Sequence, residues 1–397
     1  MASLNILYIG YWSALDGLSE ATIYPHLKVL SEFENVNKIF YVSIERSKQK
    51  VKFNISTGKI SHIPYHSPPR SFFLDKVEDF TKLPKFLTRL CRQLKIDKII
   101  CRSSSAGGIG FLVWKRTNIP YYVESFEPHA AYMRESKVWS KWGLRYWVQI
   151  YFEKAQKKTA TKLIAVSNGY KRYLIHQEKV KVCIEVLPCT VDLDKFSFKS
   201  SKRNKVRSNL DIAKDALVGI YVGKFGGIYY EKEAWVFFAQ CFAELPEFTL
   251  LLITTDEPVK LINKLNEYHL PMNRIIIDKV AHDLVPAYLS AADIAFNLHK
   301  TGQWSFALSP IKNGEYWANG LPIVISRNIG DDSSFIYKSR TGGKVVNFGQ
   351  ELKTSIRELR KLKSYSTASR KKNDCTRLAR MHRTRTLVEM VYSKILW

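Results

Sequence analysis

Short apolar segments rich in branched side chains alternate with helix-like segments along most of this chain. Leu4–Gly10, Lys38–Ile44 and Lys98–Cys101 read as buried strands, and segments with apolar residues at helical spacing lie between and after them. Parallel strands need crossover connections, so this alternation is typical of βαβ units. The same alternation starts again at Leu217–Val222 and continues to Ile323–Ser326. The pattern predicts an α/β fold made of two doubly wound, Rossmann-like sheets.

The length of 397 residues is more than one ordinary hydrophobic core accommodates, which supports two domains. The segment Ser197–Asp215 is polar, basic and poor in large apolar side chains, so we place the interdomain linker there. The predicted domains are residues 1–196 and 197–375, followed by a C-terminal helical segment, 376–397. Ligands of doubly wound sheets bind beyond the carboxyl ends of the strands, hence between the two domains.

The charge is strongly positive: 62 Lys and Arg against 36 Asp and Glu give a net charge of +26. Such a surface attracts polyanions, namely phospholipid headgroups, nucleic acid or phosphorylated substrates. No run of eighteen apolar residues occurs, and the N-terminus enters a strand without a basic leader, so we expect a cytoplasmic protein. The six cysteines lack paired or zinc-type spacing, and we expect reduced, buried thiols.

The segment Ser309–Ile325 combines a polar loop, a short helix, a Gly-Pro break and a β-branched strand. Lys312 and Glu315 are three residues apart on the helix and so face the same side. A carboxylate there can accept hydrogen bonds from two ribose hydroxyls, and the ammonium can meet a phosphate or sugar oxygen. Backbone N–H groups at a helix start suit an anion. The alternative is an ordinary surface helix followed by a buried strand.

A glycine-rich loop, Gly223-Lys224-Phe225-Gly226-Gly227, follows the predicted strand Leu217–Val222. Glycines allow backbone N–H groups to approach a pyrophosphate, and Lys224 adds a positive charge. A simple glycine turn between strand and helix explains the glycines equally well.

These motifs share their order with a known family. Ser309-Pro310-x-Lys312-x-x-Glu315-Tyr316, together with the earlier Val186-Leu187-Pro188 and Val191-Asp192 hinge segment, resembles retaining glycosyltransferases of the GT-B fold, in particular glycosyltransferase family 4. The resemblance implies an N-terminal acceptor-binding domain and a C-terminal nucleotide-sugar-binding domain facing a central cleft, with the last helix crossing back to the N-terminal domain. The implied donor-binding residues are Gly223, Lys224, Gly226, Gly227, Ser309, Pro310, Ile311, Lys312 and Glu315.

The activity implied by the resemblance is transfer of a sugar, with retention, from a nucleotide-sugar to an acceptor hydroxyl. A UDP-sugar is favoured, and neither a metal nor another cofactor is expected. Together with the positive charge, this suggests a lipid-linked glycan acceptor in bacterial surface polysaccharide synthesis, and peripheral attachment to an anionic membrane. Asp192-x-Asp194 matches a metal-binding pattern of GT-A enzymes, but it lies inside the hinge segment.

Four positions depart from the family pattern. In the hinge segment, Cys189 and Thr190 stand where Asn and Gly are usual. Tyr229 stands where a second basic residue of the phosphate loop is usual, and Lys232 comes three residues later. Ala307 stands eight residues before Glu315, where many members carry a first glutamate. We expect Lys312 to take over some contacts of that missing carboxylate.

Candidate residues also follow the strands of the N-terminal half. Glu127 and His129 lie in the loop after Tyr121–Glu124, where the resembling family has a His or an acid that touches the donor sugar. They and Lys312 are the predicted catalytic residues. A loop histidine bonded to nearby backbone is the alternative. The predicted acceptor or phosphate contacts are Gly10, Asp16, Gly17 and Arg102, for which turn and N-cap roles are the alternatives.

The helix predicted for Lys137–Thr159 places six aromatic side chains among basic residues. We expect most of these rings to pack in the core, whereas a membrane interface is the alternative. Nucleic acid is not the favoured partner. A different class of function nevertheless remains open: a non-catalytic polyanion or nucleic-acid binder that reuses the fold. Such a binder predicts salt-sensitive duplex binding and no stabilisation by nucleotide sugars.

Overall fold

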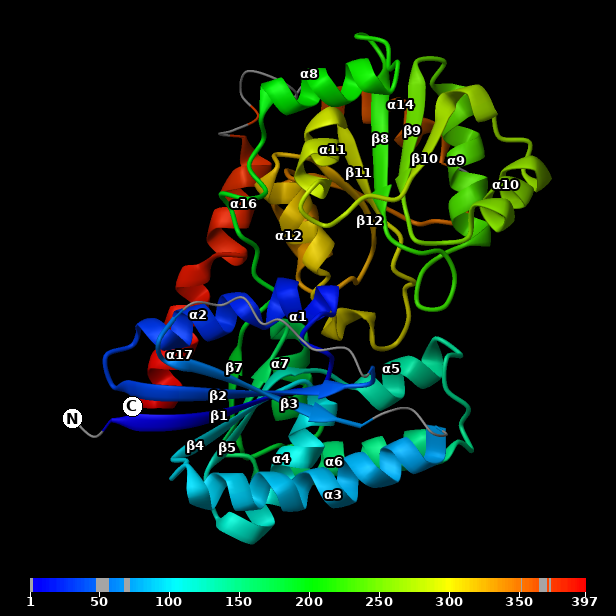
Figure 1. Cartoon of the computed structure of the whole chain (residues 1–397). Helices are drawn as coiled ribbons and strands as arrows, with labels where there is room; N and C mark the ends of the chain where they lie inside the picture. Colours follow the sequence, from blue (N-terminus) through cyan, green and yellow to red (C-terminus); the bar gives the residue numbers. More distant parts are fainter. Residues whose placement is uncertain (1–2, 48–56, 68–71, 351, 364–369, 371–372) are drawn as a thin grey trace. The chain divides into compact units, whose positions relative to one another are not determined.

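The computed structural model describes residues 3–47, 57–67, 72–350, 352–363, 370 and 373–397. The chain forms two compact units, each built on its own sheet (Figure 1). Unit 1 comprises residues 1–134, 139–190 and 385–397, and unit 2 comprises residues 135–138 and 191–384. Each sheet is parallel and alternates with helices, so the predicted α/β fold with two doubly wound sheets is confirmed.

The sheet of unit 1 has the strand order β3-β2-β1-β4-β5-β6-β7. Central strand β1 is flanked by β2 and β4, with Tyr8 opposite both Tyr41 and Ile100, and it is almost fully buried. This burial explains why its sequence is a nearly continuous apolar run. The strands are β1 (Leu4–Gly10), β2 (Val36–Glu45), β3 (Ile60–His66), β4 (Lys98–Arg102), β5 (Tyr121–Phe126), β6 (Lys162–Ala165) and β7 (Cys183–Val186).

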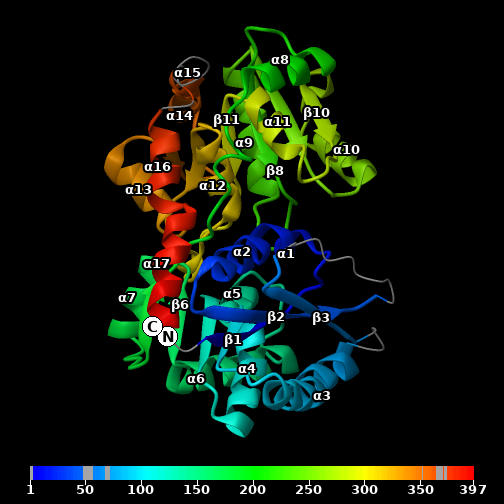
Figure 2. The same ribbon diagram turned by 60° about the vertical axis from the view of Figure 1, so that its left-hand side comes forward.

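Helices cover both faces of this sheet. In Figures 1 and 2, α3, α4 and α6 lie on one face, and α1 and α2 lie on the other. The helices of unit 1 are α1 (Gly17–Thr22), α2 (Tyr24–Glu32), α3 (Phe72–Gln93), α4 (Ser104–Thr117), α5 (His129–Glu135), α6 (Leu144–Thr159), α7 (Asn168–His176) and α17 (Arg385–Leu396).

Two predicted helices differ from the observed ones. The single helix expected over Ser19–Phe33 is two helices, α1 and α2, and Pro25 stands in the first turn of α2, where a missing N–H costs nothing. The aromatic helix expected from Lys137 begins only at Leu144, with Gly143 as its extended N-cap residue. The residues before Gly143 form turns instead of an additional helical turn.

The sheet of unit 2 has the order β10-β9-β8-β11-β12-β13. The strands are β8 (Leu217–Val222), β9 (Phe248–Ile253), β10 (Ile275–Asp278), β11 (Ile294–Asn297), β12 (Ile323–Ser326) and β13 (Gly343–Val346). The helices are α8 (Ser200–Asn209), α9 (Lys232–Glu244), α10 (Pro258–Glu267), α11 (Val285–Ala291), α12 (Ile311–Ala318), α13 (Asp332–Ser339), α14 (Lys353–Arg357), α15 (Leu359–Lys363) and α16 (Asp374–His382), with 3-10 turns η1 (Met272–Arg274) and η2 (Ser305–Ala307).

The linker prediction for Ser197–Asp215 is wrong, because this segment contains α8. Two arginines four residues apart on α8, Arg203 and Arg207, are buried and pair with the Asp293 carboxylate at 2.7 and 2.8 Å. These two basic residues of the segment therefore belong to a compensated buried ion cluster and not to a solvated connection. The chain passes from unit 1 to unit 2 between residues 190 and 191, whereas the prediction placed the boundary after residue 196.

The C-terminal segment is shared between the units: α16 belongs to unit 2 and α17 to unit 1. Helix α17 contributes Val388, Tyr392 and Ile395 to the core of unit 1, where they join Leu27 and Leu30 of α2. The Lys98 ammonium donates a hydrogen bond of 2.6 Å to the Ile395 carbonyl. The last helix is thus part of the hydrophobic core of unit 1.

Among the described residues, no helix combines the length and the apolar character needed to cross a bilayer. Four of the six cysteines are buried as expected, but Cys183 is exposed and Cys189 is partly exposed.

Candidate functional site

The carboxyl ends of β8 and β11 meet at one edge of the unit 2 sheet, because these strands are neighbours. The loops that follow them are joined by backbone hydrogen bonds. The Tyr230 N–H donates to the Leu298 carbonyl at 2.7 Å, and the Lys300 N–H donates to the Ile228 carbonyl at 3.0 Å. The glycine-rich loop is therefore held against the segment that leads to α12.

Helix α12 is tied to the same edge by two side chains. The Tyr316 hydroxyl accepts a hydrogen bond of 3.2 Å from the Val222 N–H, at the last residue of β8. The Asn297 amide at the end of β11 donates to the Asn313 side-chain oxygen at 2.7 Å. The two segments predicted to bind the donor, 223–227 and 309–315, are thus brought together in unit 2.

Glu315 is the buried centre of this edge, with 1% of its surface exposed. The Lys312 ammonium lies 2.9 Å from one carboxylate oxygen, and the His282 Nε2 atom lies 3.4 Å from the other. Burial opposes ionisation of Glu315, yet the nearby Lys312 and His282 hold the pKa of its carboxyl below the ordinary value. The carboxylate is therefore kept charged and held by two basic side chains.

His282 was not among the residues predicted from the sequence. It lies in the loop after β10, and its Nδ1 atom lies 3.3 Å from the Lys195 ammonium. Lys195 follows the Val191-Asp192 hinge segment, so that segment is linked through His282 to Glu315. A histidine shortly after a predicted strand was the available signal, because such loops share one edge with the motif helix.

A buried polar chain fixes the start of α12. The Asn313 amide donates to Asp332 at 2.7 Å, and the Arg383 guanidinium pairs with the same carboxylate. Arg383 also donates to the Ser309 hydroxyl at 2.6 Å. Arg383, which lies between α16 and α17, thereby positions the loop that precedes Glu315. Asp332 lies in the first turn of α13, directly after the N-cap residue Asp331.

The glycine-rich loop needs its glycines for conformation. Gly226 and Gly227 have φ angles of +79° and +60°, in the left-handed region that favours glycine. Phe225 anchors the loop: its N–H donates to the Asp256 carboxylate at 2.8 Å, and its ring lies 4.1 Å from that of Trp235. The side chain of Lys224 is exposed.

A second lysine contacts the loop from the segment after β11. Tyr229, which stands at the usual position, packs its ring against His299 at 4.6 Å. Burial lowers the pKa of His299 to about 4, so its imidazole is neutral at pH 7 and supplies no charge. The Lys300 ammonium, however, donates to the Gly227 carbonyl at 3.0 Å. Sequence reasoning missed Lys300 because it follows β11 and is distant in sequence from the loop.

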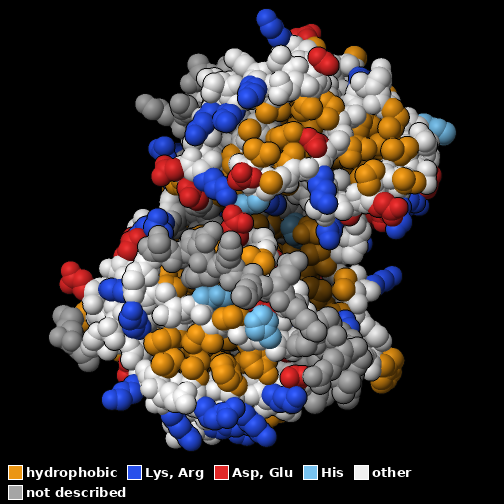
Figure 3. All heavy atoms as spheres, viewed as in Figure 1, with side chains coloured by type: hydrophobic (Ala, Val, Ile, Leu, Met, Phe, Trp, Pro, Cys, Tyr) orange, Lys and Arg blue, Asp and Glu red, His pale blue; other side chains and the backbone are white. Residues whose placement is uncertain are grey.

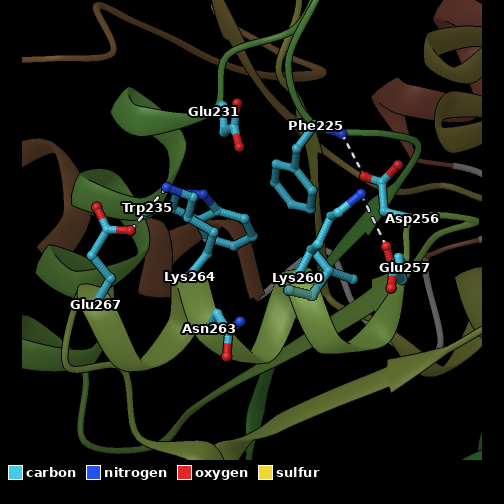
Figure 4. A pocket seen from close by; sticks show the side chains of 10 residues that line it. Phe225, Glu231, Trp235, Asp256, Glu257, Lys260, Asn263, Lys264 and Glu267 are labelled. Carbon is cyan, nitrogen blue, oxygen red and sulfur yellow. Dashed lines mark hydrogen bonds and ion pairs between the residues drawn. The ribbon is translucent and has the colours of Figure 1, made fainter.

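A pocket of about 490 Å³ lies on the α10 side of this loop (Figure 4). The rings of Phe225 and Trp235 lie at its centre, and acidic side chains outnumber basic ones around it. Its two lysines are already paired, Lys260 with Glu257 and Lys264 with Glu267. This charge balance disfavours a diphosphate. The residues lining it are Phe225, Glu231, Trp235, Asp256, Glu257, Lys260, Leu261, Asn263, Lys264 and Glu267.

Position 307, where many members of the resembling family carry a glutamate, is buried in this protein. Ala307 is completely buried in η2, next to the buried Ser305, and no carboxylate stands at this position. The first residues of α12, Ile311 and Lys312, follow the N-cap residue Pro310 and place their N–H groups at the open helix start.

The predicted catalytic residues Glu127 and His129 lie together at the carboxyl end of β5 in unit 1. The His129 Nδ1 atom lies 3.1 Å from the Glu127 carboxylate, and the His129 ring contacts Trp139 at 5.2 Å. Both side chains are partly exposed. The loop therefore presents an imidazole and a carboxylate that hydrogen-bond each other.

The other unit 1 candidates have local structural roles. Gly10 ends β1, and an added Cβ would come within 2.9 Å of Ile23. Asp16 is the N-cap of α1 and accepts a hydrogen bond of 2.8 Å from the Leu18 N–H, while Gly17 is the first helical residue. These contacts match the turn and capping alternatives.

Arg102 lies in a buried polar cluster of unit 1. Its guanidinium is 3.2 Å from the Glu124 carboxylate, and the Tyr8 hydroxyl donates to the same carboxylate at 2.8 Å. The His26 Nδ1 atom bonds the Tyr392 hydroxyl of α17 at 2.8 Å. The charge of Arg102 is thus compensated internally. Its neighbour Ser103 caps α4, as one of the alternatives proposed.

The described residues contain no group of three or more His, Cys, Asp or Glu side chains that could hold a metal ion. The Asp192 carboxylate of the Asp-x-Asp pattern accepts the N–H groups of Asp194 and Lys195 at 3.0 and 2.9 Å. It therefore caps a turn of the hinge segment.

Comparison with known proteins agrees with this architecture. Residues 46–195 match the family model Glycosyltransferase Family 4. A search of curated protein sequences finds no match. Similar solved structures include sucrose-phosphate synthase from Thermosynechococcus elongatus, with 15% identity, a TM-score of 0.75 and coverage of 99% of this chain and 98% of that one.

Two further similar structures are those of HepE and WaaG. HepE from Anabaena, in complex with UDP-glucose, has 14% identity and a TM-score of 0.72 and covers 99% of both chains. WaaG, a glycosyltransferase involved in lipopolysaccharide biosynthesis, has 14% identity and a TM-score of 0.68, over 98% of this chain and 99% of that one. The expected resemblance to GT-B glycosyltransferases is confirmed. The chain is a GT-B protein whose residues 46–195 match the Glycosyltransferase Family 4 model.

Proposed function

We propose that this protein transfers a sugar from a nucleotide-sugar, with a UDP-sugar favoured, to an acceptor hydroxyl. The observation that carries the proposal is the buried, charged Glu315 between Lys312 and His282, at the edge where the glycine-rich loop and α12 meet. UDP-glucose is the ligand of HepE, which has the same fold.

In the proposed complex, the Glu315 carboxylate accepts hydrogen bonds from the ribose hydroxyls. Lys224 and Lys300, with the N–H groups of Gly226, Gly227, Ile311 and Lys312, bind the diphosphate. Lys312 is partly exposed and adjoins Glu315, so it can move between the carboxylate and a donor oxygen. Charged donors around a departing diphosphate lower the cost of the negative charge that develops there.

The proposed reaction breaks the bond between the sugar C1 and the β-phosphate oxygen, and that oxygen keeps the electron pair. The acceptor oxygen forms the new bond to C1 on the same face, which gives retention, and the acceptor proton passes to the departing phosphate. The Glu127–His129 pair is proposed to contact the sugar. No metal takes part in this proposal, because the lysines and backbone N–H groups supply the positive charge.

The acceptor is proposed to be a lipid-linked glycan at the cytoplasmic face of a membrane, as in bacterial surface polysaccharide synthesis. The net charge of +26 supports an acceptor held at an anionic surface. WaaG, of similar fold, is described as taking part in lipopolysaccharide biosynthesis.

A screen of UDP-, GDP- and ADP-sugars by thermal shift tests the donor proposal. At ligand concentrations near a hundred times Kd, binding adds about 2.7 kcal/mol to stability, which raises the melting temperature measurably. The matching donor should then release its nucleoside diphosphate when a lipid-linked acceptor is added. A salt-sensitive affinity for duplex nucleic acid, with no shift from any nucleotide-sugar, would favour the polyanion-binding alternative instead.

A further inference from the structure

Helix α6 exposes large apolar side chains along one face. Leu144, Trp147 and Tyr151 are spaced three and four residues apart, which places them on the same side of the helix. Their exposed fractions are 57%, 53% and 58%, and Trp142 in the preceding turn is 82% exposed. We call these four residues the α6 stripe. Single exposed apolar residues are common on protein surfaces, but a continuous stripe of this size indicates a binding surface.

This exposure corrects the expectation that most aromatic rings of this segment pack in the core. Tyr146 and Phe152 do so, but Trp142, Trp147 and Tyr151 do not. The helix is therefore apolar on its inner face and, over its first half, on its outer face as well.

Cations extend the stripe along the same helix. Lys154 and Lys158 continue the three- and four-residue spacing after Tyr151, and both are exposed. The Lys141 ammonium lies 5.6 Å from the centroid of the Trp142 ring. Exposed aromatic rings next to Lys and Arg are typical of surfaces that sit at the headgroup level of a bilayer.

A second basic row lies in the same helical layer. The α3 residues Lys82, Lys85, Arg89 and Arg92 are exposed and share one helix face by their spacing. Helices α3 and α6 cover the same face of the sheet, and the rings of Phe80 and Phe152 stack between them at 4.6 Å. Figure 3 shows Lys and Arg side chains gathered along the lower edge of unit 1, where α3 lies.

We propose that the α6 stripe is a membrane-docking surface that inserts into the interface of an anionic bilayer. Anionic headgroups complement the lysines of α6 and the α3 row, and the acyl region accepts the tryptophans and Leu144. A protein partner fits less well, because lysine is depleted in the centre of protein interfaces. Single-stranded nucleic acid can stack on the rings but offers no apolar medium for Leu144. The inference adds a surface to the proposed lipid-linked acceptor, and its test needs no sugar transfer.

The test is pelleting of the 397-residue chain with vesicles of phosphatidylcholine alone and of phosphatidylcholine with phosphatidylglycerol. We expect binding to the anionic vesicles only. The double variant Trp142→Ser/Trp147→Ser should lose about tenfold or more in vesicle affinity, because two interfacial rings are removed. Trp397→Ser is the matched control, since Trp397 is 71% exposed in unit 1 but lies outside the stripe.

Two charge-reversal variants test whether the lysines of α6 contribute to vesicle binding. Lys158→Glu should weaken binding to anionic vesicles by at least about fivefold, whereas Lys28→Glu on α2 should not. Equal binding to both vesicle types, or equal losses in the stripe and control variants, would overturn the proposal. So would dimerisation or RNA binding that depends on the stripe without vesicle binding. A thermal shift with nucleoside diphosphate, measured on the same samples, reports the donor site separately, so the two proposals fail independently.

Discussion

Glu315 combines near-complete burial with a retained negative charge. Two basic side chains, Lys312 and His282, approach its oxygens from different elements, α12 and the loop after β10. A buried carboxylate without such partners would be protonated or would destabilise the fold. Lys312 and His282 are both partly exposed, whereas Glu315 itself is buried.

Lys300 provides a prediction at the residue scale. Lys300→Met removes the cation at Gly227, and we expect UDP affinity to fall by about tenfold to a hundredfold, since hydrogen bonds to charged groups contribute about 1.5–3 kcal/mol. Uridine affinity should stay unchanged, because uridine has no phosphates. Calorimetric titration with both ligands measures the difference.

Lys214→Met is the control for this variant, because Lys214 is an exposed lysine ahead of β8, away from its carboxyl end. Equal losses of UDP affinity in the two variants would show a general effect of charge. Equal losses of UDP and uridine affinity in Lys300→Met would show that the loop has been displaced instead.

The residues found from the sequence are those whose signal is local. Lys312 and Glu315 share a helix turn, so their spacing alone places them on one side. His282 and Lys300 reach the same edge from two other loops, and only the strand order brings them there. The pairing of Arg102 is hidden for a related reason: its partner Glu124 comes from the next strand, and the sequence does not show that pairing.

At the scale of elements, α12 is held by neighbours on several sides: β8 through Tyr316, β11 through Asn313, and the α16–α17 junction through Arg383. The ends of the two parallel strands and the segment after α16 thus determine where the motif helix begins. The position of Ser309 depends on a residue that is 74 positions away in sequence.

Arg383→Met tests this attachment. The change leaves the Asp332 carboxylate buried without its guanidinium, which costs about 3–5 kcal/mol of unfolding free energy. The double variant Arg383→Met/Asp332→Asn should recover part of that loss. Urea denaturation measures both.

The control is Arg385→Met, which removes exposed pairs with Glu32 and Glu389 and should cost less than about 1 kcal/mol. A loss of the same small size in Arg383→Met would contradict the proposed role of the junction.

Tyr392 of α17 bonds His26, which lies beside Glu124 in a buried cluster of unit 1. The pKa shifts in this cluster predict that acid destabilises the protein. Burial opposes ionisation of Glu124, but His26 and Arg102 lower its pKa to about 2, and burial lowers the pKa of His26. Both depressed values mean that the unfolded chain takes up protons first as pH falls. Stability is therefore retained at pH 7 and lost progressively below the ordinary values of 6.5 for His26 and 4.5 for Glu124.

Urea midpoints measured from pH 7 down to pH 4 should fall continuously. His26→Gln removes the histidine contribution and should flatten the upper part of the curve, near pH 6. A midpoint that does not change over this range, in the unmodified protein, would contradict the assigned ionisation of the cluster.

The strands could be predicted well because buried parallel strands are short, apolar and bounded by polar loops. Leu217–Val222 and Ile323–Ser326 match the sequence expectation without a shift. The helices were harder. The sequence of α8 resembles a solvated linker, because the pairing of its arginines with Asp293 is not visible in the sequence. The break between α1 and α2 at Ile23 is not marked by a glycine. In α6, finally, buried and exposed positions both carry aromatic residues, so residue type alone does not show which rings face the core.

At the scale of the whole molecule, two units carry different kinds of candidate residues. Unit 2 holds the carboxylate and the cations proposed for the donor, and unit 1 holds the Glu127–His129 pair and the α6 stripe. The net charge of +26 is compatible with a phosphate-rich donor, an anionic surface or nucleic acid. Charge therefore does not identify the function, and the proposal depends instead on the arrangement around Glu315.

Calorimetric titration of UDP into the unmodified protein and into Glu315→Gln tests the central claim most directly. The amide keeps the shape of the side chain but removes the negative charge that lies beside Lys312 and His282. We predict measurable binding to the unmodified protein and a loss of about tenfold to a hundredfold in Glu315→Gln, from the hydrogen bonds between ribose and carboxylate. Equal UDP affinity in both proteins, or no binding to either, would contradict the assignment of Glu315 as the nucleotide-binding carboxylate.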